Sequence, residues 1–270
     1  MNLDSLAQNS VAVIGVPLDA NSSFLRGSAL APAKIRQVLH SGSSNWFLED
    51  GRDLQEADWK DLGDLELPET DPQGVAEFIT AQVNGLLWRG VRLLTLGGDH
   101  SITFPLVRAF AAHHSRLTIL HIDAHSDLYE EFDANFYSHA SPFARIMEAG
   151  LAKRLVQVGL RTPSRHEREQ ARRFGVEQIL AKDWQGVLPR LEGPLYLSLD
   201  LDALDPAYAP GVSHHEPGGL GVREVLRILE QVRGSLVGAD LVELNPTRDH
   251  ADMTAAVAAK FYKELLGKLL

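Results

Sequence analysis

One stretch of the sequence decides the fold: residues 117–127 read LTILHIDAHSD. It joins a short apolar run, typical of a buried parallel strand, to alternating residues of the kinds that ligate metals. Since a strand projects alternate side chains to the same side, we expect Asp123, His125 and Asp127 to share one face. The stretch therefore predicts a buried strand that ends in a metal site.

Similar apolar runs recur along the chain, at residues 11–16, 93–96, 117–122, 155–158, 195–199 and 236–242. Segments with the apolar spacing of helices lie between them, at residues 74–89, 101–114, 139–149, 163–174, 222–232 and 252–269. This alternation predicts an α/β fold with a parallel sheet and crossover helices. Residues 41–73 lack periodicity and are expected to form a long surface connection. No repeat or linker is evident, so we expect a single domain over residues 1–270.

The composition limits the classes of function. The chain has 270 residues, 44% hydrophobic and 23% charged, as in ordinary soluble globular proteins. It has no cysteine, which excludes disulfides, thiolate metal sites and a cysteine nucleophile. A formal net charge of −10 argues against a nucleic-acid or anionic-membrane partner and is compatible with a cationic substrate. Residues 1–6 show no export signal and no later apolar run is long enough to span a bilayer, so we predict a cytoplasmic protein.

Other expected strands also end in acidic or imidazole groups: His100 in GGDHS, Asp200 and Asp202 in SLDLDALDP, and Glu243 after the last run. By the same alternation, Asp200 and Asp202 are expected to share a strand face of their own. Ligands of open parallel sheets gather beyond the carboxyl ends of the strands, so all these groups are expected at one rim. Four carboxylates and two imidazoles are too many for one ordinary zinc ion and suit two divalent ions bridged by shared oxygens. Two such ions can activate a water molecule.

With these motifs the chain resembles the ureohydrolase family, which includes arginase, agmatinase and formimidoylglutamase. The resemblance continues through SHASPFARIME (138–148), VGLR (158–161), APGVSH (209–214) and VELNP (242–246). It reaches GVPL (15–18) near the start and MTAAVAAK (253–260) near the finish. Nearly the whole chain is covered. The segments are closest in wording to the plant-type arginases, which are nearer to agmatinases than to animal arginases.

The resemblance implies a fold, a metal and an assembly. The fold is a single three-layer domain with a parallel sheet of about eight strands flanked by helices, the arginase-like fold. The metal centre holds two Mn²⁺ ions per subunit, and the subunits form a homo-oligomer, a trimer or hexamer. The implied metal ligands are His100, Asp123, His125, Asp127, Asp200 and Asp202.

The implied reaction is hydrolysis of a guanidino group to urea and an amine, which needs a strong nucleophile and a proton for the leaving amine. Asp127 is expected to ligate an ion and to orient the attacking hydroxide. His139, a short loop beyond the metal motif, is the candidate proton shuttle, because imidazole exchanges protons near neutral pH. Glu243 is the candidate guanidinium holder, since a planar cation with paired N–H donors matches a carboxylate.

The substrate is left open between L-arginine, which we favour, agmatine and other guanidino acids. Animal-type arginases grip the amino-acid end with a polar loop after the second metal motif and with acidic residues after the Gly-Leu-Arg strand end. Here residues 128–138 are acidic and aromatic, and residues 162–164 read Thr-Pro-Ser without those acids. These differences match plant-type arginases but also fit agmatine, which has no carboxylate. Besides Glu243 and His139, the candidate groups for the substrate tail are Asn135, Ser138, Thr162 and His214.

Two rival hypotheses are weaker. A catalytically silent metal-binding homologue would commonly lack a ligand or the proton shuttle, and neither is missing here. A zinc deacetylase on a related fold would need one Asp-His-Asp site and a histidine pair, and the extra His100 and Asp127 speak against it. Two nearby acids are expected outside the metal site: Asp99 as a capping or supporting group, and Asp205, before Pro206, in a turn.

Overall fold

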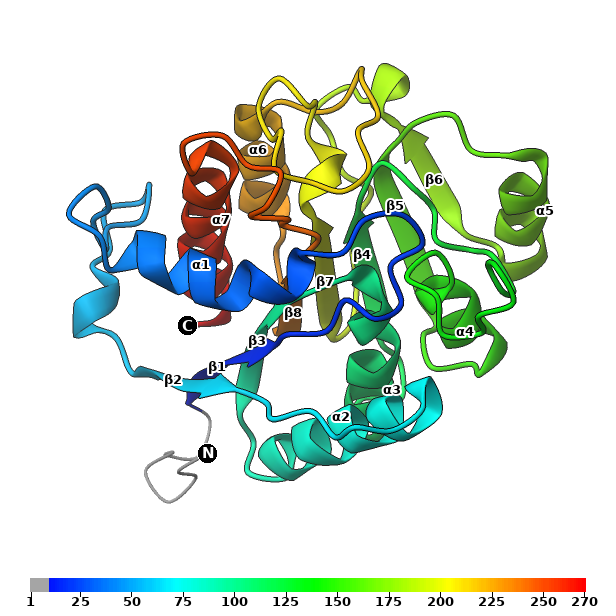
Figure 1. Ribbon diagram of the computed structural model, residues 1–270, viewed down its shortest axis with the longest axis horizontal. Coiled ribbons are helices and arrows are strands. Elements are labelled where there is room, and N and C mark those ends of the chain that lie inside the picture. Colours follow the sequence, from blue (N-terminus) through cyan, green and yellow to red (C-terminus); the bar gives the residue numbers. More distant parts are fainter. Residues whose placement is uncertain (1–9) are drawn as a thin grey trace.

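Eight parallel strands form the central sheet (Figure 1). The computed structural model describes residues 10–270. In chain order the strands are β1 (Val11–Val16), β2 (Trp59–Asp64), β3 (Arg92–Gly97), β4 (Thr118–Ile122), β5 (Arg154–Leu160), β6 (Glu177–Leu180), β7 (Leu195–Asp200) and β8 (Leu236–Val242). Across the sheet their order is β2-β1-β3-β8-β7-β4-β5-β6, and every neighbouring pair is parallel. The last two strands in the chain therefore insert between β3 and β4, in the middle of the sheet.

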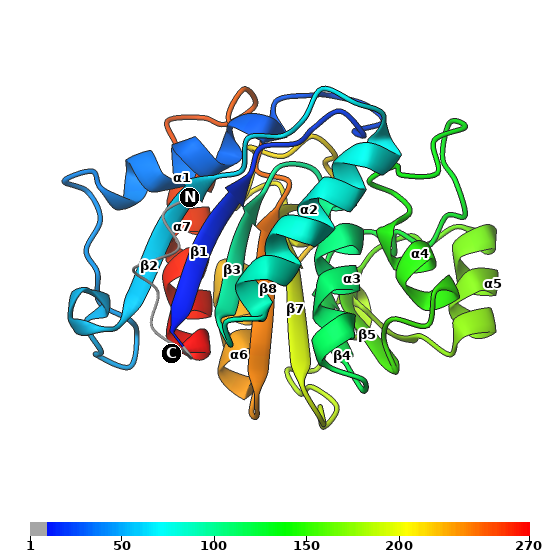
Figure 2. The same cartoon turned by 90° about the horizontal axis from the view of Figure 1, so that it is seen from below.

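Helices cover both faces of the sheet (Figure 2). One face carries α1 (Ala31–Leu39), α6 (Val222–Gln231) and α7 (Met253–Leu269), and the other carries α2 (Pro72–Leu87), α3 (Thr103–His113), α4 (Pro142–Glu148) and α5 (Arg165–Phe174). Along β1 the side chains alternate: Val11 and Val13 lie in the core beneath α1 and α7, whereas Ala12 and Ile14 lie beneath α2 and α3. A central strand buried on both faces reads as a continuous apolar run, which is the pattern seen in the sequence. The predicted three-layer α/β fold is confirmed.

Three elements differ from the sequence prediction. Strands β2 and β6 lie at the two edges of the sheet and are only partly buried, so they lack the apolar run that marks a central strand. Strand β2 also lies within residues 41–73, so the expectation that this stretch is only a long surface connection is wrong. Helix α1 was not predicted, although its buried Ile35, Val38 and Leu39 have helical spacing.

Two helix starts position residues of the site. The helix expected over residues 139–149 begins at Pro142, because proline suits the first helical turn, and His139 stays in the preceding loop. Helix α5 begins after Ser164, whose side chain accepts the N–H of Glu167 while the Glu167 carboxylate accepts the N–H of Ser164. This reciprocal capping box holds both side chains at the N-terminus of α5.

Helix length also bears on the membrane question. The longest helix among residues 10–270, α7, has 17 residues, whereas a transmembrane helix needs about 20 apolar ones. No helix in this part of the chain is both long and apolar enough to cross a membrane. The prediction that no export signal opens the chain falls on residues 1–6, outside the described residues.

Candidate metal centre

The predicted site residues follow four strands that are neighbours in the sheet. His100 follows β3, Asp123 follows β4, Asp200 ends β7 and Glu243 follows β8. These strands occupy consecutive places in the order β3-β8-β7-β4, and all run in the same direction. Their carboxyl ends therefore meet at one rim of the sheet, as the sequence predicted.

Turns, not extended strands, bring the ligands together. Strand β4 ends at Ile122, before the first ligand, and Asp127 adopts a left-handed backbone with φ 50°. Asp200 ends β7 and caps a short 3₁₀ helix, Leu201–Ala203, by accepting the N–H of Asp202 at 2.7 Å. The expectation that the two motifs present two separate strand faces is therefore wrong. In both motifs the chain turns at the end of its strand, and the ligand side chains face one shared space.

The first group of ligands surrounds His100. Its Nδ1 atom lies 3.1 Å from Asp123 Oδ2, 3.2 Å from Asp127 Oδ2 and 3.0 Å from Asp200 Oδ2. One imidazole nitrogen cannot donate a hydrogen to three oxygens at once, and His100 Nδ1, although buried, has no hydrogen-bond partner among the described residues. Nδ1 and the three oxygens thus converge on one point, where a cation would satisfy all of them.

The second group surrounds His125. Its Nδ1 atom lies 3.0 Å from Asp202 Oδ2 and 3.6 Å from Asp123 Oδ1. Asp123 therefore presents Oδ2 to the first group and Oδ1 to the second, the arrangement of a bridging carboxylate. We refer to the whole set as the metal cage, which consists of His100, Asp123, His125, Asp127, Asp200 and Asp202.

The electrostatics of the metal cage fit divalent cations. Burial, and then the neighbouring carboxylates of Asp202 and Asp123, raise the pKa of Asp200 well above its usual range. Burial and the charge of Asp123 likewise raise the pKa of Asp127 to about 6. Burial alone would lower the pKa of His100, but the carboxylates around it raise it well above its ordinary value. So many buried acids in contact need positive charge to stay ionised, and oxygen and imidazole donors suit two such ions.

His121 lies close enough to the cage to be considered a ligand, but both of its ring nitrogens are occupied. Gln157 donates to Nδ1 at 2.9 Å, so the ring hydrogen is on Nε2, which lies 2.7 Å from Asp123 Oδ2. Burial lowers the pKa of His121 to about 4, in keeping with a neutral ring. His121 therefore orients Asp123. Sequence reasoning overlooked it, although a histidine inside an apolar run, two residues before a ligand, was a usable signal.

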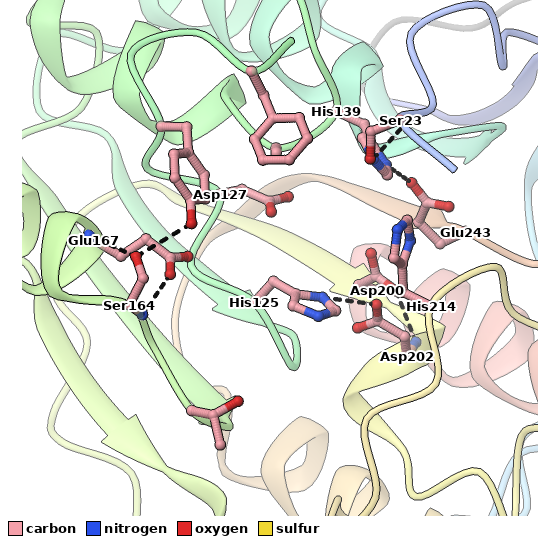
Figure 3. Close-up of a pocket in the computed structure, with 14 residues that line it drawn as sticks. Ser23, His125, Asp127, His139, Ser164, Glu167, Asp200, Asp202, His214 and Glu243 are labelled. Carbon is pink, nitrogen blue, oxygen red and sulfur yellow. Dashed lines mark hydrogen bonds and ion pairs between the residues drawn. The ribbon is translucent and has the colours of Figure 1, made fainter. Parts of the chain in front are cut away.

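The metal cage opens into a cavity of about 290 Å³ (Figure 3). Its lining includes most of the predicted site residues: His125, Asp127, His139, Thr162, Asp200, Asp202, His214 and Glu243. His100 and Asp123 lie buried beneath it. Asn135 and Ser138 do not line it: the Asn135 amide donates to Asn21 Oδ1, and Ser138 Oγ accepts the N–H of Ala140.

Six lining residues were not among the predicted site residues: Ser23, Tyr129, Phe132, Ala140, Ser164 and Glu167. Glu167 is the most informative, because it places an acidic group in the cavity just beyond the segment 162–164 that lacks one. Ser164 and Glu167 lie across the cavity from Glu243 and His139 (Figure 3). The capping box before α5 was the only sequence signal for them.

His139 is held between Glu243 and Ser23. Its Nδ1 lies 2.8 Å from Glu243 Oε1, and its Nε2 lies 3.1 Å from the backbone nitrogen and 2.8 Å from the hydroxyl of Ser23. Burial alone would lower the pKa of His139, but Glu243 raises it to about 9, which favours the imidazolium. The Ser23 N–H, however, requires a lone pair on Nε2. With its hydrogen on Nδ1, toward Glu243, His139 presents the lone pair of Nε2 to Ser23.

The two nearby acids lie outside the metal cage, as predicted. Asp99 caps the turn Asp99–Ile102 by accepting the N–H of Ser101 at 3.1 Å, and it also accepts the N–H of Asn21 at 3.0 Å. Asp205 accepts backbone N–H groups of Ala207 and Gly218 in a turn. Neither carboxylate belongs to the groups of possible metal ligands.

The fold and the metal cage define a class: metallohydrolases that build a paired metal site at the carboxyl edge of a parallel sheet. The model of the Arginase family matches residues 9–267. The chain is 48% identical to Arginase 2, chloroplastic/mitochondrial, of Arabidopsis thaliana, over 97% of this chain and 81% of that protein. It is 35% identical to the agmatinase of Bacillus anthracis, over 97% of this chain and 92% of that one. The solved arginase of Medicago truncatula superposes with a TM-score of 0.91 at 44% identity, covering 96% of this chain and 87% of that chain.

The chain belongs to the arginase family, and it is a hydrolase. The resemblance inferred from its motifs and the arginase-like fold implied by it are confirmed. The rival hypothesis of a zinc deacetylase on a related fold is not needed, since the match to the Arginase family and the metal cage agree.

Proposed function

We propose that this protein hydrolyses the guanidino group of L-arginine and releases urea and ornithine. The observation that carries the proposal is a metal cage that shares one cavity with a histidine–carboxylate pair, His139 and Glu243. The comparisons support arginine over agmatine as the substrate, because identity is 48% to a plant arginase and 35% to a bacterial agmatinase.

Manganese is the metal that we propose, with two ions per subunit. The donors of the metal cage are carboxylate oxygens and imidazole nitrogens, and the chain has no cysteine that would favour a softer ion. Bound there, a pair of divalent ions would lower the pKa of water and supply hydroxide near neutral pH. A trimeric or hexameric assembly and a cytoplasmic location stay predictions from the sequence.

Glu243 would hold the substrate guanidinium through Oε2. Its Oε1 already accepts hydrogen bonds from His139 Nδ1 and from the backbone N–H of His100 at 2.9 Å. A planar cation with N–H donors suits the remaining oxygen. The sequence analysis expected the guanidinium to bind both carboxylate oxygens of Glu243. With Oε1 occupied, we propose that it binds Oε2 alone. Asp127, on the cavity side of the cage, would orient the attacking water.

His139 would return a proton to the leaving amine. Since Nδ1 is engaged with Glu243, the proton must leave from Nε2, which faces the cavity residue Ser23. The ion pair with Glu243 raises the pKa of His139, so the ring gains a proton readily. A protonated Nε2 can then supply the hydrogen that collapse of the tetrahedral intermediate requires.

Agmatine is the second candidate substrate, and it is favoured by the lack of an Arg or Lys side chain in the cavity lining within residues 10–270. Glu167, opposite Glu243, suits an ammonium group, which arginine and agmatine both carry. Within residues 10–270, however, no Arg or Lys lines the cavity to pair with the carboxylate that only arginine has. Burial lowers the pKa of His214, so that ring is not a ready cation either. Hydroxyls such as Thr162 and Ser164 would have to bind the arginine carboxylate.

A urea-release assay on the manganese-loaded protein tests the proposal. The panel is L-arginine, agmatine and further guanidino acids, and we expect the highest kcat/KM for arginine. Asp202→Asn should abolish turnover, whereas Asp205→Asn, a change of the same kind outside the metal cage, should not. A preference for agmatine would establish the second candidate. No urea from any compound would overturn the proposed function.

A further inference from the structure

A buried chain of hydrogen bonds lies beneath His100, on the side of the ring opposite the metal cage. His100 Nε2 lies 2.8 Å from the hydroxyl of Ser198, and that hydroxyl donates to Asp240 Oδ1 at 2.6 Å. Ser198 on β7 and Asp240 on β8 are direct partners in the register of the sheet. All three side chains are at most 1% exposed. The chain therefore belongs to the rigid centre of the sheet.

Asp240 is the end point of this chain and has a second set of donors. Its Oδ2 accepts from the hydroxyl of Tyr196 at 2.7 Å and from the hydroxyl of Thr103 at 2.9 Å. Tyr196 and Ser198 are alternate residues of β7 and so lie on the same face. The two carboxylate oxygens are thus used separately: Oδ1 serves Ser198, and Oδ2 serves the other two hydroxyls.

The positions of the hydrogens make this division important. A cation bound at Nδ1 of a neutral His100 requires the ring hydrogen to be on Nε2. Nε2 then donates to Ser198, whose single hydrogen must point elsewhere, and Asp240 Oδ1 is the acceptor within reach. If Ser198 instead donated to Nε2, the ring hydrogen would move to Nδ1, the atom that faces three carboxylates of the cage.

We propose that Asp240 is a positioning residue of the metal centre, which acts through Ser198 to keep the His100 lone pair on Nδ1 and the ring turned toward the cage. This inference rests on the metal centre of the proposed function. It adds a buried residue, Asp240, that is two hydrogen bonds away from His100. Asp240 lies outside the groups of possible metal ligands and does not line the cavity. Its effect is therefore on metal affinity, and on turnover only through the metal.

Asp240→Asn tests the proposal with Mn²⁺ as the probe. An amide has one acceptor oxygen, so it cannot serve Ser198 and the two other hydroxyls as the carboxylate does. Equilibrium dialysis with metal counting should show about 10- to 100-fold weaker binding of one ion, the usual cost of losing an outer partner of a ligating histidine. Tyr196→Phe is the matched control: it removes a buried hydroxyl from Oδ2 and leaves Oδ1 with Ser198, so affinity should change much less. Circular dichroism verifies that each variant is folded.

A second measurement separates a relay from a general loss of stability. Ser198→Ala should weaken binding of the same ion. The double variant Ser198→Ala/Asp240→Asn should bind that ion no more weakly than the single variant with the lower affinity, since both changes break the same chain of hydrogen bonds. Additive losses, wild-type affinity in Asp240→Asn, or an equal loss in Tyr196→Phe would overturn the inference. If Asp240→Asn does not fold, the metal affinities of Ser198→Ala and Tyr196→Phe are compared instead. Ser198→Ala should then bind the ion more weakly than Tyr196→Phe does. Wild-type protein that binds two ions without releasing urea would instead refute the proposed function.

Discussion

His139 Nδ1 lies 2.8 Å from Glu243 Oε1, so the proposed proton shuttle and the proposed guanidinium holder share one oxygen atom. Burial raises the pKa of Glu243, but the positive charge of His139 lowers it below its ordinary value, and the carboxylate stays ionised while the pair is intact. In the proposed function, substrate binding at Glu243 Oε2 and proton delivery from His139 are therefore linked through one carboxylate. Variants of the two residues should separate the two steps.

Glu243→Gln should weaken substrate capture while both ions stay bound. The amide keeps the shape of the side chain but loses the charge that holds a guanidinium, and a hydrogen bond to a charged group contributes about 1.5–3 kcal/mol. We expect kcat/KM to fall about 10- to 100-fold, mainly through KM. Steady-state kinetics and metal counting on the same sample measure this. Unchanged kinetics would remove Glu243 from the site.

His139→Ala should slow turnover and leave the metal content unchanged, since His139 is not part of the metal cage. Loss of a general acid typically costs about 10²- to 10⁴-fold in kcat. His250→Ala, at an exposed histidine, is the control and should behave as wild type. If metal is lost together with activity, His139 supports the cage and another group must carry the proton.

The metal-free protein should lose stability as the pH rises past neutrality. Burial alone would lower the pKa of His139, but Glu243 raises it to about 9, above the unfolded value of about 6.5. A raised pKa contributes stability that is complete below the unfolded value and is lost as the pH rises through the folded one. Denaturant unfolding of chelated protein should show a loss of at most about 3 kcal/mol between about pH 6.5 and about pH 9.5. The same slope in Glu243→Gln would rule out the pair as its source.

Glu167→Gln should weaken the binding of substrates that carry an ammonium group. A guanidino compound that lacks the ammonium is the control ligand, and its KM should be unaffected. For arginine or agmatine we expect KM to rise about tenfold, because Glu167 is buried and a hydrogen bond to a charged group contributes about 1.5–3 kcal/mol. An equal rise for both kinds of ligand would show that Glu167 acts by capping α5, through Ser164, and not by contacting substrate.

Gly98→Ala should destabilise the protein and disturb the turn that presents His100. A methyl group at Gly98 would lie 1.8 Å from the backbone oxygen of Leu18, so the two segments would have to separate. Overpacking of this kind costs about 1–3 kcal/mol or more. Gly85→Ala is the control, because that glycine lies in α2 with open space around it and alanine favours helices. Thermal unfolding compares the two, and equal melting temperatures would contradict the expectation.

Residue type and local pattern were enough to predict much of the site. The six cage ligands stand in three short motifs, each directly after an apolar run, and such placement predicts a shared rim in any parallel sheet. The same patterns did not find Glu167, because a glutamate in a helical cap looks like an ordinary capping residue until the cavity beside it is known. They did not find strands β2 and β6 either, since an edge strand buries one side and has no continuous apolar run.

The sequence by itself determined the α/β alternation, the family and the chemical character of the metal cage, because apolar runs and ligand types are local properties. Only the tertiary structure decided which strand ends are neighbours. Strands β7 and β8, last in the chain, insert between β3 and β4, which brings Asp200 beside His100 and sets Asp240 opposite Ser198. Strand order depends on how crossover helices pack over the whole sheet, and no local pattern encodes that choice.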